Sequence, residues 1–499
     1  MELSFETRET AIYREFFRQS RRTQETAECV VPDTDADIEK IAAVQGTLCL
    51  KSKDLTGHGV LITGEASASV LYIREGQTGL SFVRMKKPFT LEYEVENLEL
   101  DSLAQVTLFL QGTEVRAVNP RKLSVTFEVE GELCCYREES LCTDAALPES
   151  AALGLHARTE ERSLVLPNAV CEKSLAIHEQ FSLPAGKTAP SRLVSEKTAL
   201  QVADCQLIGS RAILKGTAEI TVCALSDGRE EPERYVFSAP FSQIVEVDTE
   251  QMSACTVRPE VTGSYFELVD TISGERVVDM ELHAVLQLVC FERQSVRFVT
   301  DVYSNLMPAE PLRELRSYEL VSEAQRRRLS AEERVTLTES CGELLMTLAS
   351  LARLSADADK LSAAVNLDFL YRNAAGQLSA GRRTLSLSQE LGGKELQLLG
   401  ARVASLRTQA EGEAVNCTLT LEIDCVERTR EELSAVKAVS LDEEKAWPPE
   451  SFPTLTLVRP EGESLWALAK SYHSSVEKIR EYNADAENGA AILLIPRWI

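Results

Sequence analysis

The feature that most constrains this chain is an internal repeat with a fixed offset. Three markers recur 152 positions later: Pro32 as Pro184, Gly64 as Gly216, and Pro88-Phe89 as Pro240-Phe241. Because the offset is constant, the two stretches align without a gap. Self-similarity of this kind indicates successive copies of one structural unit.

A second marker occurs three times and indicates a third copy. Each time a strand-like run ends in a cysteine followed by charged residues, at Cys135, Cys290 and Cys425. These cysteines lie 155 and then 135 positions apart, and the third stretch lacks the Pro-Phe pair. We therefore predict three tandem modules, at residues 1–150, 151–305 and 306–440, of which the third is shorter and more divergent.

Within these modules apolar and polar residues alternate, which is the pattern of half-buried β-strands. The run Cys417–Cys425 is apolar at every second position, and Phe89–Glu96 and Val125–Glu130 alternate in the same way. Such strands bury one face and expose the other, as in antiparallel sheets and sandwiches. The predicted fold class is therefore mainly β, with three tandem β-sandwich-like repeats.

Two stretches depart from this pattern. Ile12 and Phe16 have helical spacing, so we predict a short amphipathic helix within Glu6–Arg22. The stretch Gln325–Leu354 begins with a basic run, and its second half fits a helix or a strand equally. These alternatives stay open at the level of sequence.

After residue 440 the composition changes. Residues 441–453 include the proline-rich stretch Trp447–Pro453 and are predicted to form a semi-rigid linker. Residues 454–499 predict a small unit with the order strand, helix, helix, strand. Its first helix begins at Leu465 after an N-cap at Ser464, and the second starts with a capping box of Ser474 and Glu477. Asn483 suits the C-cap of the second helix, because Asn tolerates positive φ.

Composition restricts the classes of partner. The chain has 499 residues, of which 44% are hydrophobic and 26% are charged, so it has the composition of a globular protein. Its formal net charge is -25. A surface this acidic repels phosphate backbones and anionic lipids, so nucleic acid and peripheral membrane binding are not expected.

Targeting signals are not found in the sequence. The start Met1–Glu6 has no basic or apolar signal region, and no run approaches the roughly 18 apolar residues of a membrane span. We therefore expect a cytoplasmic location without membrane insertion. The 13 cysteines are odd in number and lack a Cys-x-x-Cys pair, which favours reduced structural thiols over disulfides or a metal site.

We find no catalytic constellation, and an enzyme or a cofactor is not predicted. Asp33–Asp37 opens like a calcium loop but lacks its glycine and glutamate, and the five histidines are scattered. Ser475 and Lys478 have the Ser-x-x-Lys spacing of some hydrolases, but at the start of a helix they are expected to be structural. Arg326–Arg328 is expected to be a solvated charge cluster, and Trp466 to pack within its own small unit.

The terminal unit resembles a LysM domain along its whole length. The resemblance is carried by Val458-x-x-x-Gly462-Glu463-Ser464-Leu465-Trp466-x-Leu468-Ala469-x-x-Tyr472, by Val476-x-x-Ile479-x-x-x-Asn483, and by Leu494-Ile495-Pro496. LysM domains commonly bind N-acetylglucosamine polymers in a shallow groove. The resemblance places that groove at Gly462, Glu463, Ser464, Leu465, Asn483, Asp485, Asn488, Ile495 and Pro496. One wall departs from the family, because Asn488–Ala491 stands where a Pro-Gly is usual.

The chain as a whole resembles the clostridial-type spore-envelope morphogenetic proteins (SipL-like, with SPOCS-type repeats and a C-terminal LysM). The resemblance implies a non-enzymatic scaffold of the spore coat, located in the mother cell at the forespore surface. It also implies docking through LysM to a SpoIVA-like coat-forming ATPase. The alternative is that the LysM groove binds peptidoglycan or a similar glycan.

Overall fold

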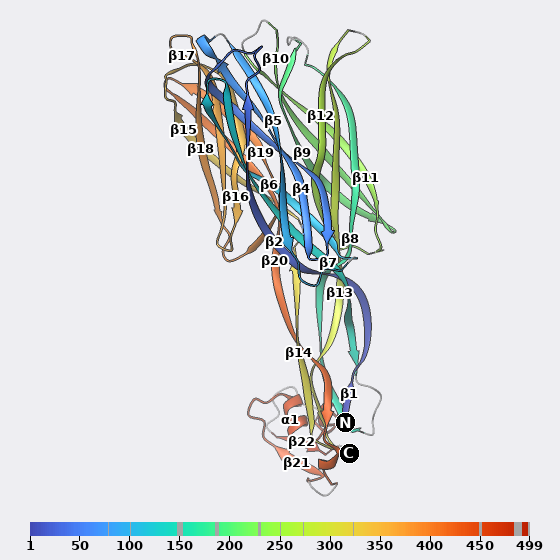
Figure 1. Cartoon of the computed structure of the whole chain (residues 1–499). Coiled ribbons are helices and arrows are strands. Elements are labelled where there is room, and N and C mark those ends of the chain that lie inside the picture. Colours follow the sequence, from blue (N-terminus) through green and yellow to red (C-terminus); the bar gives the residue numbers. More distant parts are fainter. Residues whose placement is uncertain are drawn as a thin grey trace.

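The protein is an elongated assembly of long β-strands that ends in a small unit with two short helices (Figure 1). The structure is a computed structural model, and it describes all residues except 78, 100, 147–152, 185–188, 228–230, 250, 273, 323, 449–451, 484–491 and 498–499. The mainly β fold class is confirmed.

The strands follow the chain through three stretches, here called the first (1–150), second (151–305) and third (306–440) segments. The first contains β1 (Glu2–Ser4), β2 (Glu6–Val30), β3 (Ile38–Thr56), β4 (Gly59–Arg74), β5 (Leu80–Glu94), β6 (Leu103–Asn119) and β7 (Lys122–Ala146). The second contains β8 (Leu155–Ser182), β9 (Arg192–Ile208), β10 (Arg211–Leu225), β11 (Glu233–Glu246), β12 (Ala254–Asp270) and β13 (Arg276–Ser304). The third contains β14 (Ala309–Val321), β15 (Gln325–Thr336), β16 (Cys341–Ala356), β17 (Lys360–Asn373), β18 (Leu378–Glu390), β19 (Glu395–Glu411) and β20 (Ala414–Leu441).

The same antiparallel pairing recurs in the three segments. One sheet of each segment is a meander: β3-β4-β5, β9-β10-β11 and β16-β17-β18. The other strands pair around the last strand of the segment: β2-β7-β6, β8-β13-β12 and β15-β20-β19. β7 and β13 also touch in parallel at Asp144 and Arg297, which joins the first two segments.

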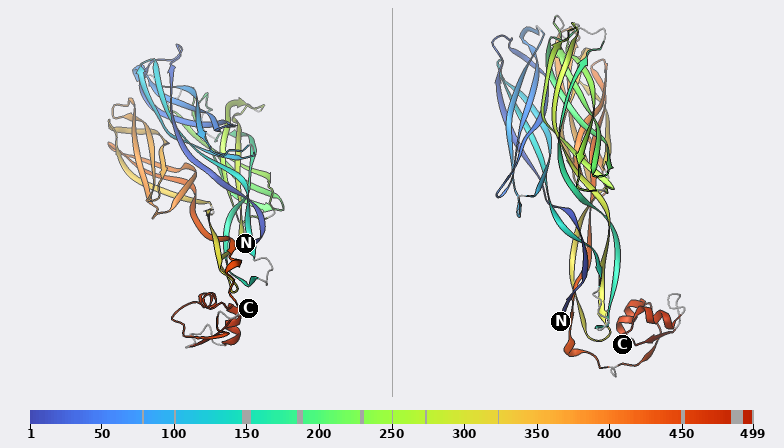
Figure 2. Two further views of the ribbon diagram at one scale, coloured as in Figure 1. Left: turned by 60° about the horizontal axis from the view of Figure 1, so that its bottom comes forward. Right: turned by 90° about the vertical axis from the view of Figure 1, so that its right-hand side faces the viewer.

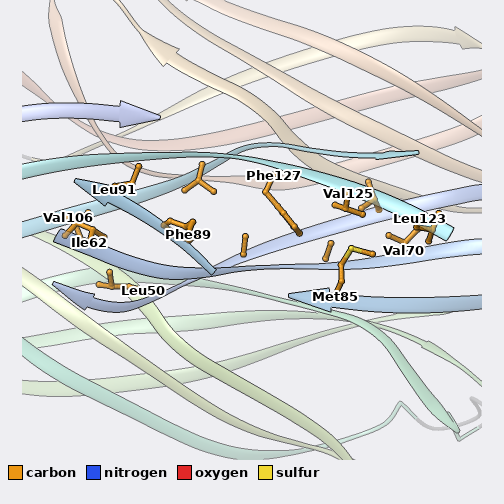
Figure 3. Packing of buried hydrophobic residues seen from close by; sticks show 14 of the residues in the cluster. Leu50, Ile62, Val70, Met85, Phe89, Leu91, Val106, Leu123, Val125 and Phe127 are labelled. Carbon is orange, nitrogen blue, oxygen red and sulfur yellow. The ribbon is translucent and has the colours of Figure 1, made fainter. Parts of the chain in front are cut away.

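Each segment buries a core between its two sets of strands. In the first segment Phe127 of β7 lies among Ile62 and Val70 of β4 and Phe89 of β5, as Figure 3 shows. These side chains are 2% exposed or less. The second and third segments have corresponding cores. The alternation in the sequence is therefore the alternation between core and solvent along each strand.

The markers of the repeat meet across neighbouring strands. Gly64 pairs with Phe89 in the first segment, and Gly216 pairs with Phe241 in the second. A Cβ on Gly64 would lie 2.3 Å from the ring of Phe89, and one on Gly216 would lie 2.4 Å from the ring of Phe241. Each glycine thus makes room for the aromatic ring opposite, which explains why the two residues recur together.

The longest strands continue beyond the cores and form a narrower neck (Figure 1). Its ribbons are the outer ends of β2 with β7, β8 with β13, and β14 with β20. Val299, Val302, Met307 and Val439 are buried in its lower part. The start of the chain also belongs there, because β1 pairs with β20 and the Met1 amino group donates to the Leu441 carbonyl at 2.7 Å.

Buried charges lie where the neck meets the cores. Arg428 of β20 donates to both carboxylate oxygens of Glu15, at 2.8 and 3.0 Å, and to Oε1 of Gln397 at 2.9 Å. Arg258 of β12 donates to Sγ of Cys134 at 3.3 Å. These contacts link strands from all three segments at one level of the molecule.

The helix predicted within Glu6–Arg22 is wrong, because these residues belong to β2. Ile12 and Phe16 are separated by an even number of positions, so their spacing fits one face of a strand as well as one face of a helix. The antiparallel pairing with β7 extends along the whole of this stretch, so the residues form a strand and not a helix. The open stretch Gln325–Leu354 is also extended, in β15 and β16.

Candidate docking site of the C-terminal unit

The C-terminal unit combines a two-stranded sheet with two short helices. β21 (Leu455–Val458) pairs with β22 (Leu493–Pro496), and α1 (Leu465–Ser471) and α2 (Val476–Tyr482) lie between them in sequence. The predicted order of strand, helix, helix and strand agrees with the structure. Val458, Leu468, Ile479, Leu493 and Ile495 form the buried core.

The helix starts are capped, but one cap differs from the prediction. Ser464 accepts from the Ala467 amide at 3.2 Å and caps α1 as expected. α2 is capped by Ser475, which accepts from the Lys478 amide at 3.1 Å. The predicted capping box at Ser474 is therefore wrong, since the Ser474 hydroxyl donates to the carbonyl of Pro496 instead.

The side chain of Asn483 links α2 to β22 through hydrogen bonds. Its side-chain amide donates to the carbonyls of Ile479 and Leu494, both at 2.7 Å, and accepts from the Leu494 amide at 2.8 Å. As predicted, Asn483 is the C-cap residue of α2, but it has φ of -138° and does not use the positive φ that Asn tolerates. Among the described residues of this unit, His473 (53°) and Gly462 (98°) have positive φ.

The predicted groove residues divide into two kinds. Gly462, Glu463 and Ser464 are exposed in the turn before α1. Leu465 is half-buried on the core, and Ile495 and Pro496 are buried. Asp485 and Asn488 lie outside the described residues. The described, accessible part of the predicted groove is therefore the turn at 462–464, while the other described members hold the unit together.

A tyrosine from the neck enters the core of this unit. Tyr303, near the end of β13, is 3% exposed and belongs to the same cluster as Leu468 and Ile479. Its hydroxyl donates to the Ser474 carbonyl at 2.8 Å. Its ring meets the edge of Trp466 with centroids 4.9 Å apart, and it stacks on His156 at 5.0 Å. Sequence reasoning missed this contact, because Tyr303 precedes the unit by about 150 residues.

Asp301 forms the polar part of the same contact. Its carboxylate accepts from Nε1 of Trp466 at 2.9 Å and from Nζ of Lys470 at 2.9 and 3.0 Å. Burial alone would raise the pKa of Asp301, but the hydrogen bonds from Trp466 and Lys470 and the charge of Lys470 lower it further than burial raises it. Trp466 thus packs within its unit as expected and also binds the neck.

This contact is expected to weaken in acid. Because its folded-state pKa is lowered, Asp301 stabilises the contact above the ordinary pKa of about 3.9, and this stabilisation is lost as the pH falls through the lowered value. The indole N–H resonance of Trp466 should shift over that interval in an NMR titration. With Asp301→Asn the resonance should not titrate there, and an identical shift in both proteins would contradict the assignment.

The residues before β21 add a second contact. Trp447 donates its amide to the Leu306 carbonyl at 2.9 Å, and its ring lies 4.1 Å from that of His473. Phe452 also lies 4.1 Å from His473, and Arg497 lies over its ring at 5.0 Å. The described part of the predicted linker is therefore anchored at both ends. Residues 449–451 lie outside the described part.

The outward face of the two-stranded sheet is apolar. Leu455 and Leu457 of β21 are exposed, Leu457 by 68%, and Leu457 pairs with Leu494 of β22. Ile492, directly before β22, is also exposed. We call these four residues the outer face. Figure 2 shows the small unit at the end of the neck, away from the long-stranded part of the molecule.

The other candidates from the sequence have structural partners. Arg326, Arg327 and Arg328 pair with Asp424, Glu427 and Glu422 of β20, at 2.8, 3.0 and 2.9 Å. These arginines are thus ion-paired along β15 rather than merely solvated. Within the described ranges, no group of three or more His, Cys, Asp or Glu residues is placed to hold a metal ion. In the same ranges, no helix has the length and apolar character to cross a membrane.

A comparison with protein families matches part of the first segment. Residues 37–118 match the family model described as SipL, SPOCS domain. This stretch spans β3 to β6 almost completely. The match supports a SipL-like protein related to sporulation. No curated protein and no solved structure matches the chain.

Proposed function

We propose that this chain is a non-enzymatic scaffold of spore-envelope and coat assembly, acting in the mother cell at the forespore surface. The observation that carries the proposal is the SPOCS match over residues 37–118. The described chain consists largely of long antiparallel strands. The faces and edges of such sheets are surfaces on which other proteins can dock, as a scaffold requires.

The three segments are proposed to be three SPOCS-like copies. The matched stretch comprises β3, β4, β5 and β6, and the offset of 152 carries it onto β9, β10, β11 and β12. β16 to β19 pair in the same way in the third segment. The recurring Gly-Phe contact supports a common origin of the first two copies.

The C-terminal unit is proposed to be a LysM-like module that docks a protein partner. Trp466, Lys470 and Ser474 are engaged by the neck, so this side of the unit is occupied by the chain itself. The outer face remains accessible and is apolar. Exposed apolar surface of this kind is typical of a protein interface.

The proposed partner is a SpoIVA-like coat-forming ATPase, which the resemblance of the whole chain implies. The net charge of -25 favours a partner whose contact surface is basic. No cofactor is proposed, because the role requires binding alone.

Co-purification with the ATPase tests the docking role. The full chain carrying Leu457→Asp should recover less partner by about tenfold or more, since a charge is buried at the centre of an apolar contact. Leu315→Asp is the matched control, because Leu315 is exposed to a similar degree on β14. A chain ending at Phe452 should recover none. Equal recovery from all four proteins would exclude the C-terminal unit from docking.

A second candidate is glycan binding at the exposed turn Gly462–Ser464. It predicts that the full chain sediments with insoluble peptidoglycan at high salt. Removal of residues 462–465 should then abolish sedimentation, whereas Leu457→Asp should not. Failure of the full chain to sediment would reject this candidate and leave the protein-docking proposal unaffected.

A further inference from the structure

Cysteine side chains from opposite sheets converge in the second segment. Cys255 of β12 and Cys290 of β13 are directly opposite in the antiparallel register. Cys205 of β9, in the facing meander, completes the group, because it packs against the same core as Cys255 and lines the same cavity. All three belong to or pack against one core, and Cys171 of β8 packs there as well.

The convergence is not a requirement of the repeated fold. In the first segment the residue opposite Cys135 is Ala104, and in the third the residue opposite Cys425 is Leu398. The position 152 residues before Cys205 is Lys53. The same architecture therefore forms without this group of thiols, and their presence in the second segment calls for a separate explanation.

A cavity gives small molecules a route to these thiols. It has a volume of about 610 Å³ and lies between the three segments, with β3, β6, β9, β12 and β19 among its walls. Cys205 and Cys255 both line it, and Cys290 is the residue paired with Cys255 on the neighbouring strand. The thiols are thus shielded from large reagents but adjacent to space that admits a small oxidant.

We propose that Cys255 and Cys290 form a site of oxidative modification, at which hydrogen peroxide converts the two thiols into a cross-strand disulfide. Residues directly opposite on antiparallel strands have Cα atoms about 4.5–5.5 Å apart, which falls within the range that a disulfide bridges. The inference does not rest on the function proposed above.

Formation of this disulfide needs no reactant other than one molecule of hydrogen peroxide. The Cys290 sulfur attacks one peroxide oxygen, the O–O bond breaks, and the departing hydroxide takes a proton to become water. The sulfur of Cys255 then displaces hydroxide from the sulfenic acid, so that the S–S bond and a second water form. Two sulfurs lose two electrons in total, and one peroxide gains them.

The pKa directions agree with a first attack by Cys290. The neighbouring Cys255 thiol lowers the pKa of Cys290 despite the opposing effect of burial. The neighbouring thiols of Cys205 and Cys290, together with burial, raise the pKa of Cys255. The thiolate is the nucleophile, and the same disulfide results whichever sulfur is oxidised first.

Thiol counting and peptide mapping on the full-length protein test the proposal. After peroxide treatment in the folded state and labelling in denaturant, two fewer thiols than the 13 of the chain should react. The intact mass should fall by about 2 Da, because two hydrogens leave. A non-reducing digest should contain the peptide that links Cys255 to Cys290.

Matched variants locate the bond. Cys255→Ser and Cys290→Ser should lose no thiol pair, whereas Cys417→Ser, which replaces a buried cysteine of the third segment, should still lose two. Cys205→Ser should also still form the bond. The proposal is overturned if the wild-type thiol count stays unchanged, if the linked peptide joins other cysteines, or if the purified protein holds stoichiometric zinc on these thiols. The non-reducing peptide map of the unsubstituted protein tests the proposal even where a variant fails to fold.

Discussion

Replacing Arg428 with alanine is expected to lower the free energy of unfolding by about 3–5 kcal/mol, because it removes the two closest charged hydrogen bonds of a largely buried carboxylate. Among the described residues, that carboxylate, Glu15, would keep only the Tyr136 hydroxyl at 3.1 Å and the Arg18 guanidinium at 3.6 Å. The side chain of Arg428 is 2% exposed, and it donates to both oxygens of Glu15 and to Gln397. The side chain of Glu15 is only 10% exposed, so water could replace few of the lost hydrogen bonds. The urea midpoint measured by circular dichroism reports the loss.

Arg430 provides the control on the same strand. Its side chain is 64% exposed and pairs with Glu319 at the surface, so Arg430→Ala should cost less than about 1 kcal/mol. The double replacement Arg428→Met with Glu15→Leu should recover most of the lost stability, because no charge is then left unpaired. Equal urea midpoints for the Arg428→Ala and Arg430→Ala proteins would contradict the expected contribution of the Arg428–Glu15 ion pair to stability.

Replacing Tyr303 with alanine is expected to release the C-terminal unit from the neck. The ring fills part of the unit's core, and truncation of a buried aromatic side chain typically costs about 3–5 kcal/mol. Tyr303→Phe keeps the ring and loses the hydrogen bond to Ser474, so it should cost only about 0.5–1.5 kcal/mol. Limited proteolysis within residues 441–453 should be fastest for the alanine variant and intermediate for phenylalanine.

Tyr265→Ala is the appropriate comparison, because Tyr265 lies on β12 and is 59% exposed. It should leave the cleavage rate within twofold of the unchanged protein, since surface substitutions usually alter stability by about 0.5 kcal/mol or less. Equal cleavage of the Tyr303→Ala and Tyr265→Ala proteins would mean that the neck does not hold the unit.

The candidate site could be predicted from the sequence only in part. Gly462 and Ser464 were identified by the motif, and they are exposed as a binding turn requires. Asn483 and Ile495 were identified by the same motif, but they hold the unit together. A motif records which residues recur, and it does not separate those that bind from those that pack.

Strand alternation, the offset of 152 and the order of elements in the last unit could be read from the sequence, because each depends on residues close together along the chain or on direct repetition. The mistaken helix at Glu6–Arg22 shows the limit of this approach, since two apolar residues four positions apart fit either periodicity. Pairing with β7, more than a hundred residues away, excluded the helix.

Only the tertiary structure decided how the strands extend into a neck, how β1 joins β20, and how Tyr303 enters the terminal unit. The same holds for the packing of Cys205, Cys255 and Cys290 around one core. These contacts join residues that the periodicity of a single strand does not relate. Burial and hydrogen bonding among distant segments select them, and they form only when the whole chain has folded.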